Sequence, residues 1–312
     1  MPLELSCKDI EAWTLPQLVE HLREAKLDPS SFESLAAAAP ALQRLSNNKT
    51  FLSEEICSQL GNYRKIQDGN AYTPQVFMLY GLEAVAQRYF IRACFWPAAD
   101  DQLVYSSGSK AYFYGVPHDH NFNFLTIGHH GPGYLSDYYE YDYDSVVGYE
   151  NEPVTTRFTG RSALHPDRIL LYRALKDIHS QLPPDSFSVS LNIMENSPRS
   201  AVLDQYEFSA DVSRVARIIG GASPLPLFSL VATSTPDEGS DLLLTIFKNH
   251  PLDRVRMHAL QAVASASGSR DEALSLLGRV NRGHSCFMRE TARRLASKIA
   301  TPTEKGSDHA DN

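Results

Sequence analysis

The middle of the chain constrains the fold most, because it consists of closely spaced short runs that favour β-strands. Between about Asp101 and Phe208, runs dense in Val, Ile, Tyr, Phe and Thr are separated by Gly, Pro and Asp. Such runs, bounded by turn-forming residues, are typical of strands. Seven or more short strands in about 110 residues predict a sandwich or a small barrel. The expected strands are Leu103–Tyr105, Ala111–Gly115, Phe122–Ile127, Tyr138–Tyr143, Val154–Phe158, Ile169–Tyr172 and Ser186–Met194.

The segments on either side have helical patterns. Thr14 before Leu15-Pro16 predicts an N-cap followed by a proline in the first helical turn. Further helices are expected at 35–45, 53–60, 76 to about 91, 241–248, 252–265, 270–279 and 287–300. We therefore expect an α+β protein with a helical region over 1–95, a β-barrel over 96–210, a second helical region over 211–300, and a disordered polar tail over 301–312.

Two of the C-terminal helices have similar sequences. Arg254–Val263 follows Pro251 and has Val, Ala and Leu on one face, and Cys286–Leu295 has a similar pattern about 30 residues later. This pattern resembles the helices of HEAT-type repeats, which stack side by side into a solenoid. The resemblance implies a helical surface for a protein partner.

Composition excludes several classes of protein. With 43% hydrophobic and 21% charged residues, the 312-residue chain can form a packed core. Asp plus Glu number 37 against 29 Lys plus Arg, so a role in binding nucleic acid is not expected. No signal peptide or membrane span is evident, and we expect a cytoplasmic protein. The cysteines, which are too scattered for a disulfide scaffold or a Cys-based metal site, are Cys7, Cys57, Cys94 and Cys286.

The segment Gly115-Val116-Pro117-His118-Asp119-His120 contains the most informative polar residues. On a strand, His118 and His120 point to the same face with Cα atoms about 6.5 Å apart, whereas Asp119 points the other way. Two imidazoles at this spacing can converge on one metal ion. A pair of surface histidines would give the same pattern, so the motif alone is weak.

A third histidine, His179, strengthens this interpretation. With it, the region resembles the cupin superfamily, in which a His-x-His pair is followed by three or four residues, usually Glu, six residues and Gly, and a later strand adds another His. His120, Phe124 and Gly131 fit that frame, with Phe in place of Glu. Cupins with three His and no Glu are similar to the thiol dioxygenases. The resemblance covers about 80 residues. It implies a double-stranded β-helix barrel that holds Fe(II) on His118, His120 and His179.

The identity of the metal follows only from that resemblance. Imidazole suits Fe, Ni, Cu and Zn, and the lack of a carboxylate disfavours Mg and Ca. Fe(II) is implied, while Ni, Cu, Zn and Mn remain open. His129 and His130 precede a Gly-Pro-Gly turn. Adjacent residues on a strand face opposite ways, so at most one of these two could reach the metal.

A second notable segment, Tyr134–Tyr149, alternates tyrosines with acidic residues. On a strand, Tyr139, Tyr141 and Tyr143 would share one face, and Tyr138 and Glu140 the other. The simpler interpretation is an aromatic core face opposite a solvated acidic face. Alternatively, Glu140 is an added metal ligand or orients one of the histidine ligands, or the acidic face receives a cationic substrate, and Tyr139 acts as an acid or base near the metal.

Arginines lie between the two histidine motifs, and one of them could bind a substrate carboxylate through two hydrogen bonds. Arg157, on an expected strand, is the candidate, although a surface position is the alternative. Gln181 and Ser188 lie near the third histidine and could line the site. The other arginines of this stretch are Arg161, Arg168 and Arg173.

Two function classes remain open. The first is a mononuclear non-haem iron oxygenase that oxidises an amino-acid-like, peptide or carrier-bound substrate with O2, and whose helical regions bind a larger substrate. The second is a non-catalytic metal- or ligand-binding cupin with helical arms for a protein partner. If the histidines are only structural, neither class holds. Neither nucleic acid nor a membrane is an expected partner.

Overall fold

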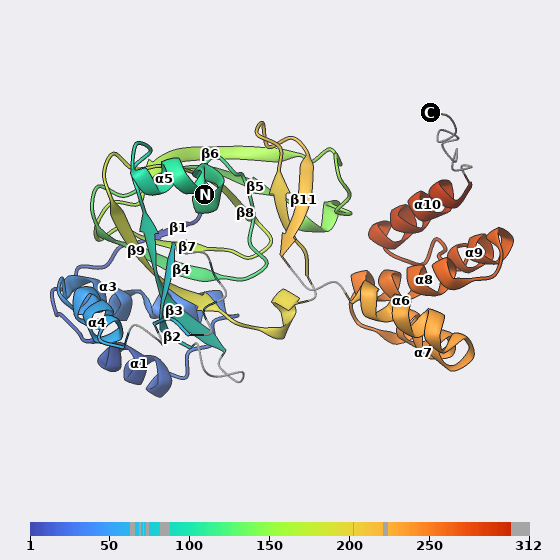
Figure 1. Ribbon diagram of the computed structural model, residues 1–312, viewed down its shortest axis with the longest axis horizontal. Coiled ribbons are helices and arrows are strands. Elements are labelled where there is room, and N and C mark those ends of the chain that lie inside the picture. Colours follow the sequence, from blue (N-terminus) through green and yellow to red (C-terminus); the bar gives the residue numbers. More distant parts are fainter. Residues whose placement is uncertain are drawn as a thin grey trace, which may run out of the picture. The chain divides into compact units, whose positions relative to one another are not determined.

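The computed structural model describes residues 1–62, 66–68, 70, 72, 75–81, 88–201, 203–220 and 224–300 (Figure 1). The chain divides into two compact units. The sheet unit comprises Met1–Tyr143 and Gly148–Gly221, and the helical unit comprises Asp144–Val147 and Ala222–Asn312. The boundary expected near residue 95 thus lies inside the sheet unit. The expected tail at 301–312 falls outside the described residues.

A six-stranded antiparallel sheet is the centre of the sheet unit, with strand order β1-β7-β4-β9-β3-β2. Its side chains alternate between two separate cores, as the two-residue period of a strand requires. On β9, for example, Leu191 and Ile193 join one core, whereas Met194 joins the other. The strands are β1 (Leu3–Leu5), β2 (Val76–Tyr80), β3 (Tyr89–Trp96), β4 (Phe124–His130), β7 (Ile169–Tyr172) and β9 (Ser188–Glu195).

The N-terminal helices cover one face of this sheet (Figure 1). They are α1 (Leu15–Glu24), α2 (Phe32–Ala37), α3 (Ala39–Asn47) and α4 (Phe51–Leu60). Thr14 caps α1 as predicted: its hydroxyl accepts from the Gln17 amide at 3.4 Å, and the Gln17 side chain accepts from the Thr14 amide at 2.8 Å. Leu18, Leu22 and Leu42 pack from these helices onto the sheet.

Two smaller sheets complete the sheet unit. β5 (Leu135–Tyr141) pairs with β6 (Thr156–Ala163) and β8 (Asp177–Leu182), and β10 (Gln205–Phe208) pairs with β11 (Val215–Gly220). The second core contains Tyr138 from β5 together with Trp96 and Tyr172 from the large sheet. It therefore lies between the three-stranded and six-stranded sheets.

Three sequence predictions about secondary structure were wrong. Within the expected helix at 76–91, the described residues form β2 and the start of β3, whose apolar residues face both cores and so mask the strand period, and residues 82–87 lie outside the described part. The expected strand Leu103–Tyr105 is part of α5 (Gln102–Ser107), where the Asp101 carboxylate caps the Leu103 amide at 2.9 Å. Most of Ala111–Gly115 belongs to a 3-10 helix and a turn. Strands β1, β10 and β11 were not predicted, and β8 was implied only by the cupin resemblance, which places His179 on a later strand.

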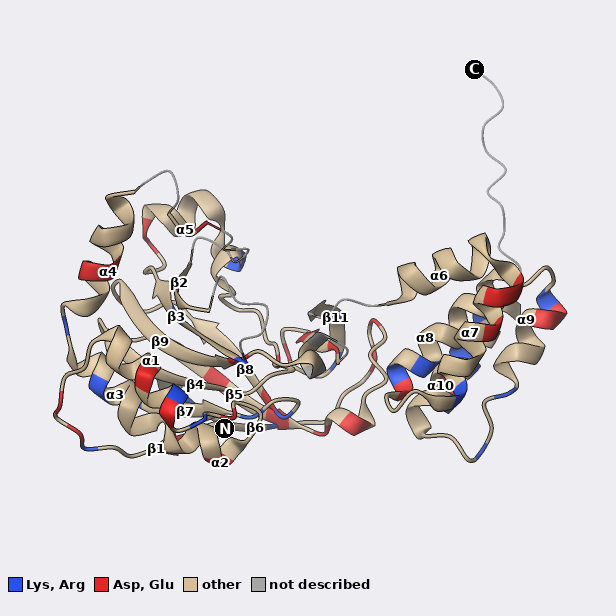
Figure 2. Ribbon diagram, turned by 90° about the horizontal axis from the view of Figure 1, so that it is seen from below, with Lys and Arg blue, Asp and Glu red and all other residues tan. Residues whose placement is uncertain are grey.

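The helical unit contains α6 (Leu225–Ser234), α7 (Pro236–Asn249), α8 (Asp253–Ala266), α9 (Arg270–Leu277) and α10 (Cys286–Ala300). The four helices predicted from the sequence are confirmed as α7–α10. Leu243, Phe247, Leu260 and Met288 lie in their common core. Figure 2 shows both signs of charge among α7–α10, whereas α6 carries no charged residue. None of the described helices combines the length and apolarity that crossing a bilayer requires.

Candidate metal centre

The backbone holds His118 beside His179. His118 lies in a short extended segment ahead of β4, and His179 lies on β8. Each backbone N–H donates to the other residue's carbonyl at 3.0 Å, so the two residues are fixed opposite one another. On its other edge the segment pairs with β10, through the Asp119 amide and the Tyr206 carbonyl at 3.1 Å. This pairing explains how histidines distant in sequence meet.

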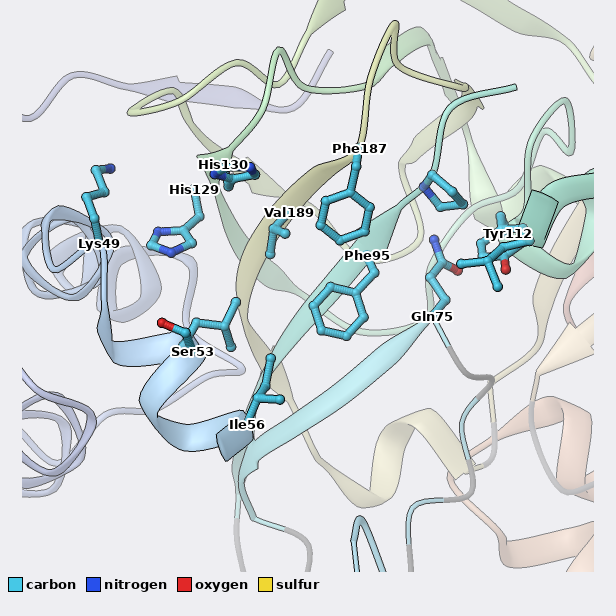
Figure 3. Close-up of a pocket in the computed structure, with 13 residues that line it drawn as sticks. Lys49, Ser53, Ile56, Gln75, Phe95, Tyr112, His129, His130, Phe187 and Val189 are labelled. Carbon is cyan, nitrogen blue, oxygen red and sulfur yellow. The ribbon is translucent and has the colours of Figure 1, made fainter. Parts of the chain in front are cut away.

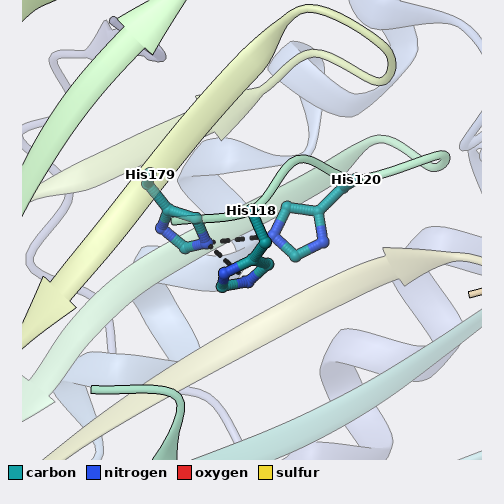
Figure 4. Close-up of side chains that lie close together, drawn as sticks. All are labelled: His118, His120 and His179. Atoms are coloured by element: carbon teal, nitrogen blue, oxygen red, sulfur yellow. Dashed lines mark hydrogen bonds between the residues drawn. The ribbon is translucent and has the colours of Figure 1, made fainter. Parts of the chain in front are cut away.

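The alternation expected around Asp119 is confirmed. The Asp119 carboxylate accepts from the Tyr141 hydroxyl at 2.5 Å and from the Tyr206 amide at 2.6 Å. Burial raises the pKa of Asp119 to about 7, although these hydrogen bonds oppose the rise. Asp119 therefore anchors the segment on the side away from the histidine cluster, while His118 and His120 point together on the other side (Figure 4).

The three imidazoles converge on one point (Figure 4). One ring nitrogen from each of His118, His120 and His179 lies within 4.8 Å of the others. Nε2 of His179 is 3.0 Å from Nε2 of His120 and 3.2 Å from Nε2 of His118. A metal ion about 2.1 Å from each nitrogen, with ligands near right angles, needs nitrogens about 3.0 Å apart. The cluster therefore has the dimensions of a metal site.

The outer ring nitrogens have partners of their own. Nδ1 of His118 donates to the Val116 carbonyl at 2.8 Å, so its Nε2 presents a lone pair to the cluster. Nδ1 of His179 lies 3.3 Å from the Tyr172 hydroxyl. Nδ1 of His120 lies 3.3 Å from the amide nitrogen of Gln205, a donor that favours the tautomer with the proton on Nε2. A metal ion at Nε2 of His120 would have to displace that proton.

Burial keeps these imidazoles uncharged. It lowers the pKa of His118 to about 4. The pKa values of His120 and His179 are held well below the usual range by burial first and by their histidine neighbours second. Neutral imidazole is the form that binds metal ions, so none of the three has an imidazolium proton to lose at neutral pH, although His120 must still give up the proton on its Nε2.

The cluster opens into a cavity of about 210 Å³ between the two larger sheets. Its lining is largely aromatic, and the described residues that form it include no Asp or Glu. Phe124, at the position where the cupin frame usually has Glu, stacks on Tyr172 with ring centroids 4.2 Å apart and contacts the His120 ring at 4.8 Å. The structure thus places an apolar ring at the position of the missing carboxylate.

Arg92 is the functional candidate that the sequence did not reveal. It lies on β3 and is the one Lys or Arg among the described residues that line the cavity. Its buried Nε atom has no hydrogen-bond partner among the described residues. Its charge helps to lower the pKa of His120, after burial and the two neighbouring histidines. The alternation of Arg92 with Cys94 and Trp96 could have indicated it, had the segment been recognised as a strand.

Tyr139, Glu140 and Arg157 lie outside this cavity. The Glu140 carboxylate accepts from Arg157 at 2.6 Å and from Arg173 at 2.7 Å. Burial opposes its charge, but hydrogen bonds from the N-terminal ammonium and Arg173 lower the pKa of Glu140 to about 2. The Tyr139 ring packs against Phe158. These contacts involve none of the three histidines.

Tyr138, rather than Tyr139, is the tyrosine buried in the core. Tyr138 and Tyr139 do point to opposite faces, because β5 pairs with β8 without a register shift and sets Tyr138 opposite His179. The face with Tyr138, and not the face with Tyr139, is therefore the core face. The other arginines named above are bound elsewhere: Arg161 by Asp137, Arg168 by Glu4 and Arg173 by Asp177.

The other histidines that the structure describes lie outside the cluster. His129 is buried on the opposite face of the sheet, with Nδ1 3.2 Å from the Ser46 hydroxyl, and His130 and His165 are exposed. Neither His129 nor His130 is a metal ligand in this arrangement. Gln181 does line the cavity, with its amide nitrogen 3.5 Å from Nε2 of His179, whereas Ser188 donates to the Ser186 carbonyl instead.

Comparisons with known proteins give only distant likenesses. No protein-family profile and no curated protein matches the chain. Among solved structures, it is similar to the DMSP lyases RdDddP and RnDddQII, with 15% identity, a TM-score of 0.24, and coverage of 63% of this chain and 80% of that chain. The chain is also similar to the DMSP lyase DddQ from Ruegeria pomeroyi DSS-3, with 11% identity, a TM-score of 0.23, and coverage of 64% of this chain and 78% of that chain. A third likeness is to prolyl 4-hydroxylases from Phytophthora capsici, with 13% identity, a TM-score of 0.22, and coverage of 92% of this chain and 83% of that chain. Likeness at these TM-scores carries no argument, so the interpretation of the site rests on its own residues.

Proposed function

We propose that the chain is a cupin-type mononuclear metalloenzyme that uses Fe(II), held by His118, His120 and His179, to oxidise a small substrate with O2. The convergence of three buried, neutral imidazoles is the observation that carries this proposal. Three buried imidazoles that turn their Nε2 atoms to one point offer a cation three neutral nitrogen ligands. The resemblance of the histidine spacing to three-His cupins supports the same conclusion.

The donor set suits a redox-active divalent metal. Three neutral nitrogens and a lining without Asp or Glu leave the full charge of the ion uncompensated. This favours Fe, Ni, Cu or Zn over Mg or Ca, and iron is the choice that the cupin resemblance implies. When bound, the ion would supply a centre at which a chelating substrate and O2 can react.

Arg92 is the group that would orient the substrate. Its guanidinium can bind a carboxylate through two parallel hydrogen bonds, and no acidic side chain in the cavity competes for it. Phe124 and Trp96 supply apolar walls that exclude water from the reacting groups. A cavity of about 210 Å³ holds a group the size of an amino acid. The substrate is therefore an amino acid or the terminal residue of a peptide or carrier-bound molecule.

The helical unit would serve the larger part of such a substrate or its carrier. Leu227, Leu230 and Leu242 are exposed on α6 and α7, each with more than half of its surface accessible. Exposed leucines of this kind are available for a protein contact. The same observation supports the second candidate function, a non-catalytic metal-binding protein that docks a partner. Turnover distinguishes the two.

Metal analysis tests the metal centre. The full chain, loaded anaerobically with Fe(II) and desalted, is expected to retain about one iron per chain, and the His118→Ala, His120→Ala and His179→Ala variants almost none. His130→Ala is the matched control, because His130 is an exposed histidine outside the cluster. Wild-type protein that retains no iron, or triad variants that retain as much as the control, would contradict the proposal.

Oxygen consumption tests the enzyme assignment. Free amino acids, N-acyl amino acids and short peptides are compared with their methyl esters, which lack the carboxylate. We expect turnover of a carboxylate form, and a higher KM in Arg92→Gln with unchanged iron content. Iron-loaded protein that consumes no O2 with any member of this set would favour the non-catalytic alternative.

A further inference from the structure

A second, larger pocket lies on the opposite face of the six-stranded sheet. Its volume is about 500 Å³, within the range of small-molecule sites. Figure 3 shows it between α4, which supplies Ser53 and Ile56, and the sheet, which supplies Phe95 and Val189. The Phe187 ring, stacked on Phe95 with centroids 6.0 Å apart, extends the apolar wall. This pocket plays no part in the proposed metal chemistry.

The lining favours an anion with an apolar body. Among the described lining residues there is no Asp or Glu, whereas Lys49 lies at one side, near His129 and His130 (Figure 3). Nζ of Lys49 donates to the Ser46 carbonyl at 2.9 Å and lies 4.0 Å from Asp167, so it remains within reach of a ligand carboxylate at the rim. The charge of Lys49 also helps burial to lower the pKa of His129 to about 4.

Gln75 supplies an independent sign of a ligand. Its side chain is only 6% exposed, and its amide nitrogen has no hydrogen-bond partner among the described residues. A buried donor without a partner is costly, so the position calls for an acceptor that the chain itself does not supply. Gln75 lines the apolar pocket, away from Lys49 (Figure 3), and also borders the histidine cavity.

We propose that this pocket binds a small apolar carboxylate that carries a second oxygen at its far end, such as a hydroxylated medium-chain acid. The carboxylate lies by Lys49 and His130, the apolar body lies between Ile56 and the Phe95 and Phe187 rings, and the distal oxygen accepts from Gln75. This ligand satisfies the exposed cation, the apolar walls and the buried donor together.

Isothermal titration of the full chain with three matched probes tests the proposal. Decanoate has the charge and the apolar chain, decanol lacks the charge, and 10-hydroxydecanoate adds the distal oxygen. We expect 10-hydroxydecanoate to bind about fivefold more tightly than decanoate, and this preference to disappear in Gln75→Leu. Lys49→Met should weaken decanoate about fivefold and leave decanol unchanged. Equal binding of decanoate and 10-hydroxydecanoate by the wild type would overturn the role of Gln75.

A filling variant locates the binding. Ile56→Trp places a larger ring in the pocket and should weaken 10-hydroxydecanoate at least about tenfold. Ser58→Trp adds the same ring to an exposed position of α4 that does not line the pocket, and it should bind as the wild type does. Absence of saturable binding up to millimolar probe, or equal binding by both tryptophan variants, would overturn the site.

The outcome is independent of the proposed oxidation. His120→Ala removes one histidine of the proposed metal site but none of the residues that line the apolar pocket. It should therefore bind 10-hydroxydecanoate like the wild type while losing iron. If His120→Ala lost 10-hydroxydecanoate binding together with iron, the probe would occupy the histidine cavity. That result would overturn the proposal of a separate site.

Discussion

The histidine cavity and the apolar pocket lie on opposite faces of the same sheet, and single strands contribute to both. On β3, Arg92 and Trp96 line the histidine cavity, whereas Phe95 lines the apolar pocket. On β9, Asn192 lines the first and Val189 the second. Because successive side chains of a strand point to opposite faces, neighbouring residues in the sequence belong to different sites.

The two faces are also organised by different interactions. The face toward the histidines has buried polar residues held by hydrogen bonds, such as Nε1 of Trp96 donating to the Ser190 hydroxyl at 3.0 Å. The face toward the helices is formed almost wholly by apolar residues such as Ile91, Leu191 and Ile193. The helix-covered face should therefore contribute most of the stability, and the other face should determine the chemistry.

The largest expected difference in the free energy of unfolding is between substitutions at two neighbouring residues of β9. Leu191→Ala should lower the free energy of unfolding by about 2–5 kcal/mol, because it leaves a cavity in the core. Ser190→Ala should cost about 1–3 kcal/mol, because it leaves Nε1 of Trp96 without a partner. Both tryptophans, Trp13 and Trp96, lie in the sheet unit, so urea unfolding followed by tryptophan fluorescence reports on that unit. A larger loss in Ser190→Ala would break the contrast between the faces.

Metal binding should stabilise the sheet unit through the histidine face alone. At a free metal concentration 100 times the dissociation constant, the gain is about 2.7 kcal/mol. Thermal unfolding of the wild type with and without Fe(II) measures it, and a chelator should reverse it. The same addition should leave His179→Ala unchanged. A gain of equal size in that variant would place the stabilising metal elsewhere.

The helix-covered face should carry a pH dependence of its own. In the folded protein the pKa of His129 is about 4, below its ordinary value of 6.5, chiefly because of burial. The unfolded chain therefore binds more protons between these values, and stability falls as the pH is lowered from 6.5 to 4. His129→Asn removes this titration and should reduce the slope by up to about 1.4 kcal/mol per pH unit. Urea unfolding at several pH values checks it, and an unchanged slope would contradict the assignment.

The smallest expected effect concerns the helices themselves. Thr14→Ala removes the cap of α1 and should cost about 1 kcal/mol. Thr14→Ser keeps the hydroxyl and should lose much less. Iron retention should be the same in both variants, because the cap lies on the helix-covered side of the sheet. Urea unfolding compares the two, and equal losses would show that the hydroxyl does not act as a cap.

The sequence predicted the three clustered histidines better than the residues around them. The spacing of His118 and His120 is local, and an extended backbone alone places both rings on one side. Arg92 was missed because β3 is buried on both faces, so its apolar residues show no simple alternation. The alternating pattern left open which face of β5 is the core, because the long-range pairing that sets Tyr138 opposite His179 is not visible in the sequence. These failures arise where tertiary contacts override a local pattern.

Because both cavities are built on the same sheet, β9 cannot tolerate the insertion or deletion of a single residue. Removing or adding one residue within β9 would turn Val189, Leu191 and Ile193 toward the histidines and their polar neighbours toward the helices. Both sites would be lost in one step, so insertions and deletions should be absent from this strand in any functional relative. Substitutions are not restricted in this way, because odd-numbered residues of β9 such as Val189 face the apolar pocket and even-numbered residues such as Asn192 face the histidine cavity. The lining of each cavity can therefore change while the other is kept.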